Sequence, residues 1–287
     1  MNNLNRRAPA QFSYFEPSAS LKGLVAFHYR IEVGDAPLDV GICSLLGQLQ
    51  ITLRGTNAYD FGGEPEIGPA AAISGPTTRA ARLISPAGSV AIGCGLTPAG
   101  WSVFVNASAS SLAHRVVRLS EVMGADADRL PSACLAAGFD EGPSLLDAFL
   151  RANLKGRIPD PRIAKIDAWV LRDGDQCADS LASKLSMSRR SLERFTSSTH
   201  GAPPKLLAAK YRALKAAARM AAGEVPDWRD AAELGDFVDQ SHFIRHFKRH
   251  VGMTPRAFNA ASDSFVHCLI MGRWQPGKDL GIALWAS

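Results

Sequence analysis

Short apolar segments typical of β-strands run through the first half of the chain. Residues 24–33 are rich in branched and aromatic side chains. Further along, Leu49, Ile51 and Leu53 alternate with polar neighbours, which predicts a strand with one apolar face. Similar runs follow, separated by Gly-Pro and Pro-Ala-Gly turn signals, at 70–74, 79–85 and 89–96. About six short strands with such punctuation predict a small sandwich or barrel.

Helical periodicity takes over in the second half. Two helical patterns already occur before it, at about 108–119 and 143–154. Residues 155–161 (KGRIPDP) then have the composition of a linker. Apolar residues then recur at helical spacing in residues 204–222, with Pro204 near the start and Gly223 at the end. These patterns predict a long amphipathic helix within an all-helical region.

The fold class predicted by these patterns is α+β and multidomain. A β-rich sandwich or barrel with flanking helices occupies residues 1–157, and an all-α domain occupies residues 158–261. Residues 262–287 form an apolar C-terminal extension, for which we predict a strand pair at 265–274 and 280–285. Exposing so much apolar surface to water is unfavourable. We therefore also hypothesise that this extension docks onto the β-rich half and couples the two domains.

Composition is that of a soluble globular protein, with 46% hydrophobic and 21% charged residues. The sequence contains no run of about 18 uncharged apolar residues, so we expect no transmembrane helix. The start, MNNLNRRAPAQFSYFEP, lacks the apolar core of a secretory signal. The five cysteines form no CxxC pair, which favours free thiols in a reducing cytoplasm over disulfides or a zinc site.

Positive charge is concentrated in the helical half. Residues 1–157 hold 13 Lys/Arg and 13 Asp/Glu, whereas residues 184–256 hold 14 and 7. A neutral half joined to a basic half indicates that only the second half meets a polyanion, although solvated helical faces are often basic too.

A repeated unit gives the basic half its strongest functional signal. Residues 187–196 (MSRRSLERFT) and 238–247 (VDQSHFIRHF) resemble each other at a spacing of 51 residues. Ser188 and Asp239 are good N-caps, and each begins a helix with an apolar inner side and a polar outer side. A short helix precedes each, at 178–185 and 228–234. A short helix, a turn and a polar-faced helix form a helix-turn-helix, here predicted twice, at about 177–200 and 227–251.

Residues about 163–260 resemble the DNA-binding domain of the AraC/XylS family of transcription regulators. The second unit and its end, Gly252-Met-Thr-Pro255, match the family pattern most strongly. Residues 75–79 (GPTTR) and 115–119 (RVVRL) are similar, more loosely, to the sensor halves of family members. The resemblance implies a cupin-like β-rich sensor domain and two helix-turn-helix units joined by a long helix. Thr196 departs from the usual aromatic residue, and Asp236 from the usual turn glycine.

The candidate DNA-binding residues lie on the outer sides of the two second helices. They are Ser188, Arg189, Arg190, Ser191 and Arg194 in the first, and Gln240, Ser241, His242, Arg245, Lys248 and Arg249 in the second. Arginine and glutamine side chains can read guanine and adenine edges in a major groove. Each arginine could instead contact a phosphate or simply be solvated.

Other chemistry is weakly indicated. His242, His246 and His250 have metal-like spacing on one helix, but that helix is already explained and no acidic or thiol partner is near, so we expect no metal and no cofactor. Residues 1–157 hold only two histidines, His28 and His114, too few and too far apart for the ligand set of a metal-dependent oxygenase. The GxSxG motif of a serine hydrolase does not occur, and neither does the cysteine cluster of a methyl-accepting repair fusion. We therefore expect no catalytic residues. The sequence singles out no ligand-binding residue.

The sequence therefore predicts a cytoplasmic, sequence-specific transcription regulator, which by resemblance is an effector-responsive activator. Its expected partners are double-stranded DNA, RNA polymerase, a small-molecule effector and a second copy of the chain, with no membrane. Two alternatives remain open: a constitutive architectural DNA-binding protein, and a regulator whose first half binds a protein partner instead of a small molecule.

Overall fold

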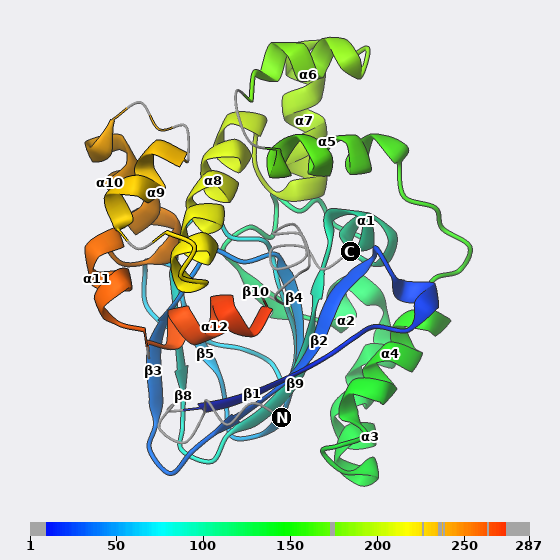
Figure 1. The fold of residues 1–287 in the computed structure, drawn as a ribbon. Helices are drawn as coiled ribbons and strands as arrows, with labels where there is room; N and C mark the ends of the chain where they lie inside the picture. Colours follow the sequence, from blue (N-terminus) through cyan, green and yellow to red (C-terminus); the bar gives the residue numbers. More distant parts are fainter. Residues whose placement is uncertain are drawn as a thin grey trace.

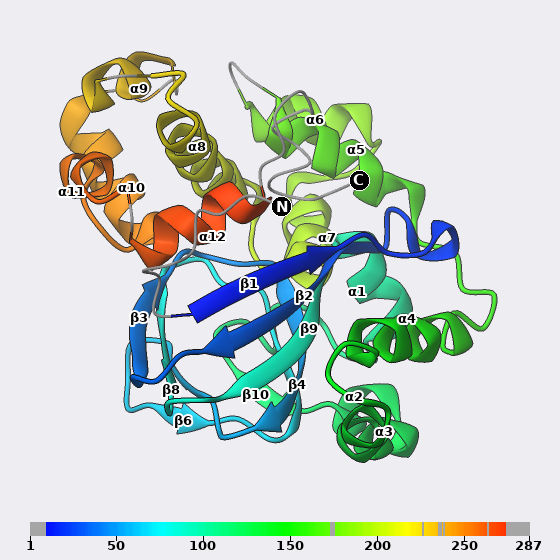
Figure 2. The same cartoon turned by 60° about the horizontal axis from the view of Figure 1, so that its bottom comes forward.

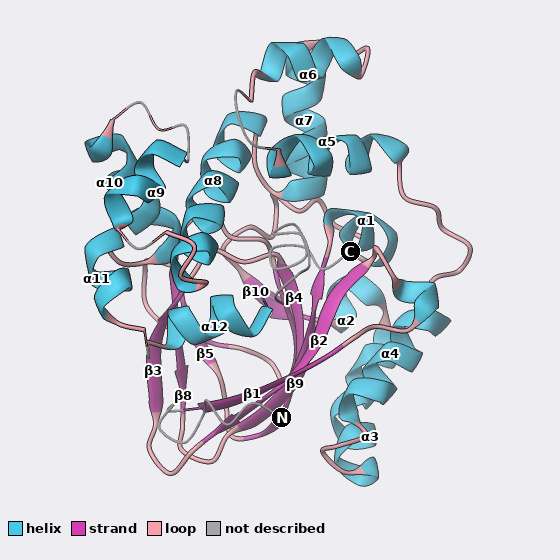
Figure 3. Cartoon of the chain, viewed as in Figure 1, coloured by secondary structure: helices cyan, strands magenta, loops and turns pink. Residues whose placement is uncertain are grey.

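The structure is a computed structural model that describes residues 10–172, 176–225, 227–234, 237, 239–262 and 264–273. The first part, residues 10–157, is built around two antiparallel sheets and is called the β-rich domain below (Figure 1). The rest is helical and lies over one end of the sheets (Figure 3). The predicted fold class, a β-rich domain followed by a helical region with helix-turn-helix units, is confirmed.

The larger sheet has six strands in the order β1-β2-β9-β4-β7-β10. Its strands are β1 (Ala10–Phe15), β2 (Val25–Val33), β9 (Val90–Leu96), β4 (Gly47–Arg54), β7 (Ala71–Ser74) and β10 (Val116–Arg118). All its pairings are antiparallel, with Leu49 opposite Cys94 and Leu49 also opposite Ile73. The runs at 24–33, 48–54, 70–74 and 89–96 therefore form the strands that their patterns predict.

The smaller sheet has four strands in the order β3-β8-β5-β6. Its strands are β3 (Leu38–Ile42), β8 (Ala81–Ser85), β5 (Ala58–Asp60) and β6 (Glu66–Ile67). Of these, the sequence analysis identified only β8. Strands β3, β5 and β6 are short, and their few residues carry little alternation to recognise.

The two faces of the larger sheet have different partners. Leu49 and Ile51 of β4 are fully buried in a core that α-helices complete on the outer face. Gln48 and Gln50 of the same strand point to the inner face, between the sheets. The covering helices are α1 (Pro98–Phe104), α2 (Ser120–Met123), α3 (Leu130–Ala137) and α4 (Gly142–Ala152), with short 3-10 turns η1 (Ala19–Leu21) and η2 (Ala125–Arg129).

The helices predicted at 178–185, 204–222 and 228–234 are present, and their ends differ from the predicted ones by one residue at most. Its elements are α5 (Pro161–Leu171), α6 (Ala178–Lys184), α7 (Arg189–His200), α8 (Pro204–Ala221), α9 (Trp228–Leu234), α10 (Gln240–Val251) and α11 (Pro255–Ala260). Its apolar residues join those of the inner face of the β-rich domain in one continuous core, which includes Leu46, Tyr211 and Phe247. The two halves are therefore packed together through buried apolar contact.

Two predictions about secondary structure are wrong. Residues 265–273 form a helix, α12 (Phe265–Arg273), where we predicted a strand. This helix buries Phe265 and Leu269 against β1, β3 and α8 (Figure 2). Residues 274–287, which include the second predicted strand, lie outside the described residues. The helix predicted at 108–119 is a loop that leads into β10, because its apolar residues fill the core beneath β7 instead of lining a helical face.

Two global features complete the fold. Among the described residues the cysteines form no disulfide, and Cys43, Cys94 and Cys134 are buried. In the part of the chain that the structure describes, the helices lack the length and apolarity that crossing a bilayer requires.

Candidate DNA-binding surface and ligand pocket

The first helix-turn-helix unit consists of α6 and α7. The hydroxyl Oγ of Ser188 accepts a hydrogen bond from the Ser191 backbone amide at 3.1 Å and so caps α7 as predicted. Leu192 and Thr196 are fully buried, which fixes the inner side of the helix. The candidate residues on its outer side are all exposed: Ser188, Arg189, Arg190, Ser191 and Arg194. This arrangement presents three guanidinium groups to solvent.

The outer arginines of α7 differ in their surroundings. Arg189 contacts Asp179 and Glu193, each at 3.4 Å. Arg190 and Arg194 form no ion pair with any described residue. Because Arg189 already has two acidic neighbours, Arg190 and Arg194 are the arginines of this helix that remain available to an external anion.

The second unit consists of α9 and α10. Asp239 Oδ1 accepts a hydrogen bond from the His242 amide at 2.7 Å and caps α10, as predicted. Phe243, Phe247 and Val251 are fully buried and form its inner side. Gln240, Ser241, Arg245, Lys248 and Arg249 are exposed, while His242 is half-buried with its ring 4.4 Å from that of His246. Asp236, noted in the sequence as a departure from the usual turn glycine, lies outside the described residues.

Helix α8 joins the two units and packs against both (Figure 1). Its 18 residues give a length of about 27 Å. Two of its lysines are buried, and backbone carbonyls compensate their charge: Lys215 Nζ donates to Leu171 and Arg172 at 3.2 and 2.9 Å, at the end of α5. Lys210 Nζ donates to the Leu45 carbonyl of the β-rich domain at 2.7 Å. The middle of the connecting helix is thus bonded both to α5 and to the β-rich domain.

Both second helices end against the β-rich domain. The Ser198 carbonyl of α7 accepts a hydrogen bond from the Ala109 amide at 2.8 Å. The Arg249 and His250 carbonyls of α10 accept from Ala80 and Ser44, both at 2.7 Å. The last carbonyls of a helix lack partners within the helix, and here loops of the β-rich domain supply them.

One six-residue connection, residues 75–80 between β7 and β8, contacts both units. Gly201, which ends α7 with φ +84°, lies so close to Pro76 that an added Cβ would be 2.4 Å from its ring. At the other unit, Arg249 Nε donates to the Thr78 carbonyl at 3.3 Å. We call residues 75–80 the bridging connection.

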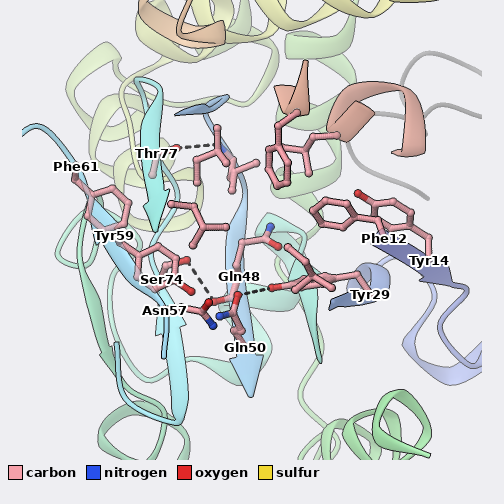
Figure 4. A pocket seen from close by; sticks show the side chains of 16 residues that line it. Phe12, Tyr14, Tyr29, Gln48, Gln50, Asn57, Tyr59, Phe61, Ser74 and Thr77 are labelled. Carbon is pink, nitrogen blue, oxygen red and sulfur yellow. Dashed lines mark hydrogen bonds between the residues drawn. The ribbon is translucent and has the colours of Figure 1, made fainter. Parts of the chain in front are cut away.

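A pocket lies between the two sheets, beneath the helical region (Figure 4). Its volume is about 60 Å³, enough for more than one water molecule. It is lined by residues of both sheets, of the connections at 45, 57, 61 and 77, and of α12. Figure 4 shows Phe12 and Tyr14 on one side of it, and Tyr59 and Phe61 on the other.

Amide and hydroxyl groups line the floor of this pocket. Tyr29 donates from its hydroxyl to Gln50 Oε1 at 3.0 Å, and Asn57 Nδ2 donates to Thr52 at 3.0 Å. Ser85 donates to Asn57 Oδ1 at 2.5 Å. Burial raises the pKa of Tyr59 well above its usual value, so its hydroxyl stays neutral. The site therefore combines apolar walls with a small number of oriented polar groups, as ligand pockets do.

A family model described as a helix-turn-helix domain matches residues 181–261. The matched range begins within α6 and ends just after α11, so it includes both units and the helix between them. Residues 181–261 are an AraC-type helix-turn-helix domain. This domain supports a role of the chain in DNA binding and transcription regulation. A comparison of the sequence with curated proteins gives no match.

Solved structures with a related course of the chain include ToxT from Vibrio cholerae, at 11% identity and TM-score 0.46, over 88% of this chain and 98% of ToxT. ToxT with a bound unsaturated fatty acid gives 11% identity and TM-score 0.45, over 87% and 94%. The AraC-like transcriptional activator CuxR gives 9% identity and TM-score 0.29, over 65% and 73%.

The AraC-type domain places the predicted residues in two groups. Arg190, Arg194, Gln240, Ser241, Arg245 and Lys248 are exposed on the outer sides of α7 and α10. Arg249 instead faces the β-rich domain, where both its side chain and its carbonyl are bonded. Sequence reasoning missed this role because the contact joins residues 171 positions apart.

The sequence also does not predict that two histidines lie at the boundary between the AraC-type domain and the β-rich domain. His250 is fully buried, and burial together with the nearby Lys210 ammonium lowers its pKa to about 3. The Nε2 atom of His114 accepts a hydrogen bond from the Thr78 backbone amide at 3.2 Å, and burial beside Arg79 lowers the pKa of His114 to about 4. Both rings are therefore neutral at physiological pH. Among the described residues, no group of His, Cys, Asp and Glu side chains could hold a metal ion.

Proposed function

We propose that this chain is an effector-responsive, sequence-specific transcription regulator that acts in the cytoplasm, as an activator rather than a repressor. The observation that carries the proposal is the pair of capped helices, α7 and α10, each with an exposed basic outer side in an AraC-type domain. Packing of that domain against a β-rich domain with a partly open pocket between its sheets supports the response to a small molecule.

DNA is read in this proposal by α7 and α10 in successive major grooves. Base edges are contacted by Arg190 and Arg194 from α7 and by Gln240, Ser241 and Arg245 from α10, in keeping with the donor patterns that read guanine and adenine. Ser188, Arg189, Ser191, His242 and Lys248 contact the backbone and fix the register. Arg249 joins them once its contact with Thr78 opens.

The effector acts by binding one domain arrangement better than another. A ligand shifts an equilibrium only through such a difference in affinity. In the structure, the ends of both recognition helices are bonded to the β-rich domain, so any change in that packing alters how the helices are presented. RNA polymerase and a second copy of this chain are the protein partners that we propose for the DNA-bound state.

The test is DNA binding of the purified full-length protein across a salt series. The probes are the DNA upstream of its own gene, sequences selected from a random library, and a scrambled control. We expect affinity to fall steeply with salt, and the preferred sequence to bind about 10³-fold or more better than the scrambled one.

A matched control separates the recognition helices from general basic charge. Arg118→Ala removes one exposed charge from β10 of the β-rich domain and should leave the sequence preference intact. A steep salt dependence without any sequence preference, with and without candidate effectors, would contradict the proposal and favour an architectural DNA-binding protein.

A further inference from the structure

Helix α12 forms one wall of the pocket, although it follows the AraC-type domain in the chain. Phe265 and Leu269 are buried on α12 and line the pocket, and the Phe265 ring lies 5.2 Å from that of Phe12 in β1. Figure 4 shows the α12 ribbon above Phe12 and Tyr14. The pocket is thus closed by a segment outside the β-rich domain.

The pocket has no charged side chain among the described residues that line it. The lining consists of six aromatic rings, five aliphatic side chains, three carboxamides and two hydroxyl side chains. The buried ammonium of Lys210 donates to the Leu45 carbonyl at 2.7 Å and is not part of the lining. A carboxylate or an ammonium placed here would lose its hydration without gaining a counter-charge, which is strongly unfavourable.

The aromatic rings and the carboxamides point to the complementary ligand. Rings such as Tyr59 and Phe61, stacked 6.0 Å apart, and Phe12 offer faces and edges to a flat apolar group. Gln48, Gln50 and Asn57 offer both donors and acceptors. Resting on the proposed function, we propose that this pocket binds an uncharged aromatic molecule that carries a hydroxyl or carbonyl group, and that α12 transmits its occupancy to the second helix-turn-helix unit.

A continuous set of ring contacts joins α12 to α10. His267, on the helix that carries Phe265, stacks at 5.2 Å on Phe258 of α11. Phe258 in turn lies 5.6 Å from Phe247, the fully buried residue at the centre of α10. At about 60 Å³ the pocket is smaller than an aromatic ring requires, so a ligand of this class has to displace Phe265 or Leu269. It thereby moves a helix that is packed, through the His267 and Phe258 rings, on the core of α10.

The first experiment tests the ligand class on the full-length protein. Matched alcohols, carboxylates and amines on one-ring and two-ring aromatic skeletons, with cinnamyl alcohol, cinnamate and cinnamylamine among them, are titrated at pH 7.5 by thermal shift and calorimetry. We expect the alcohols to bind at least about 10-fold more tightly than either ion, because burial penalises the charges. Equal or tighter binding of the ions, or no binding of any alcohol, would overturn this class.

The second experiment tests α12. The ratio of DNA affinities with and without the best alcohol is measured in the wild type, in Phe265→Ala and Leu269→Ala, and in Val266→Ala. Val266 is buried on the same helix but does not line the pocket, so its variant controls for weakened packing. We expect a ratio of about 5-fold or more in the wild type and in Val266→Ala, and a ratio near one in the other two.

The outcomes separate this inference from the proposed function. An undiminished ratio in both pocket variants overturns the role of α12 while leaving a ligand-responsive regulator. Ligand binding without any sequence-specific DNA binding overturns the proposed function, yet it still decides the ligand class. If Phe265→Ala does not fold, Phe265→Leu, which keeps an apolar wall but removes the ring on Phe12, takes its place.

Discussion

The two helix-turn-helix units share a frame but have different cores. At a spacing of 51 residues, the caps Ser188 and Asp239 coincide, and so do the terminal glycines Gly201 and Gly252, both with positive φ. The docked carbonyls of Ser198 and Arg249 also occupy equivalent positions. Yet the fully buried Thr196 of the first unit stands where the second has Phe247.

The buried contacts of the first unit are polar where those of the second are aromatic. His200, at the end of α7, is buried with its Nε2 3.0 Å from Asp167, and Thr196 donates to the Glu193 carbonyl at 3.2 Å. In the second unit, Phe247 packs edge-on to Phe243 and Phe258. The two units thus have the same caps, helix ends and docking positions, and these define the shape of the unit, while different side chains can fill its interior.

The largest expected effect on this comparison is the loss of Phe247. Phe247→Ala should lower the free energy of unfolding by about 3–5 kcal/mol, since it leaves a cavity among fully buried rings. Thr196→Ala, at the equivalent position, removes far less volume and should cost about 1 kcal/mol. Chemical denaturation of both variants measures the two values. Equal losses would show that the units do not differ in how they are stabilised.

Arginine substitutions compare the two outer surfaces. Arg194→Ala and Arg245→Ala, which are equivalent and both exposed, should each weaken specific DNA binding by about 1–3 kcal/mol and relax the preference at a different base pair. The double variant should show the sum if the two helices bind separate grooves. Binding titrations on systematically altered sites test this. Relaxation at the same base pair would refute two separate contact sites.

Acid should affect the second unit selectively. The pKa of His250 is lowered from 6.5 to about 3 by burial and by Lys210, His246 and Arg249, whereas the equivalent position of the first unit is Thr199. Below pH 6.5 the unfolded chain takes up a proton here that the folded chain does not, so stability falls as the pH decreases towards 3.

His250→Leu removes this proton uptake. Between pH 6.5 and 5 it should lose about 1–2 kcal/mol less stability than the wild type. Urea unfolding at several pH values is the measurement, and His200→Leu in the first unit serves as the comparison. Identical pH profiles for wild type and His250→Leu would contradict the buried, neutral state of this ring.

The smallest expected effects concern the caps. Ser188→Ala and Asp239→Ala each remove one side-chain acceptor for a backbone amide, so each should cost about 1 kcal/mol of stability. Ser188→Asp should retain the cap, because aspartate fills this role in the second unit. A loss several times larger in one unit than in the other would show that the frame is not equivalent.

Local signals explain which parts of the fold were predictable. Ser188, Asp239, Pro204 and Gly252 are caps and terminators whose effect depends on neighbours within a few residues, and the helices they bound were predicted closely. Helix α1 has the same kind of signal, since Thr97 caps it and Pro98 occupies its first turn. In the sequence, Pro98-Ala99-Gly100 is interpreted as a turn signal, so this helix is not predicted.

Long-range packing explains what could not be predicted. Gln48 and Gln50 alternate with apolar residues in a pattern that usually indicates a solvent-facing side, but a second sheet and α12 enclose that side. The branched residues of 265–270 favoured a strand, and only contact with β1, β3 and α8 makes them a helix. The proposed base contacts, in contrast, rest on local pattern alone.

The bridging connection, residues 75–80, bears on how α7 and α10 would be spaced on DNA. Pro76 abuts the end of α7, and Thr78 and Ala80 bond the end of α10, so one six-residue segment contacts the ends of both helices. In the proposed mode of DNA binding, the distance between the two half-sites on DNA then depends on the β-rich domain as well as on the length of α8. Inserting or deleting a residue in this segment would change the preferred half-site spacing while leaving every base-contacting side chain in place.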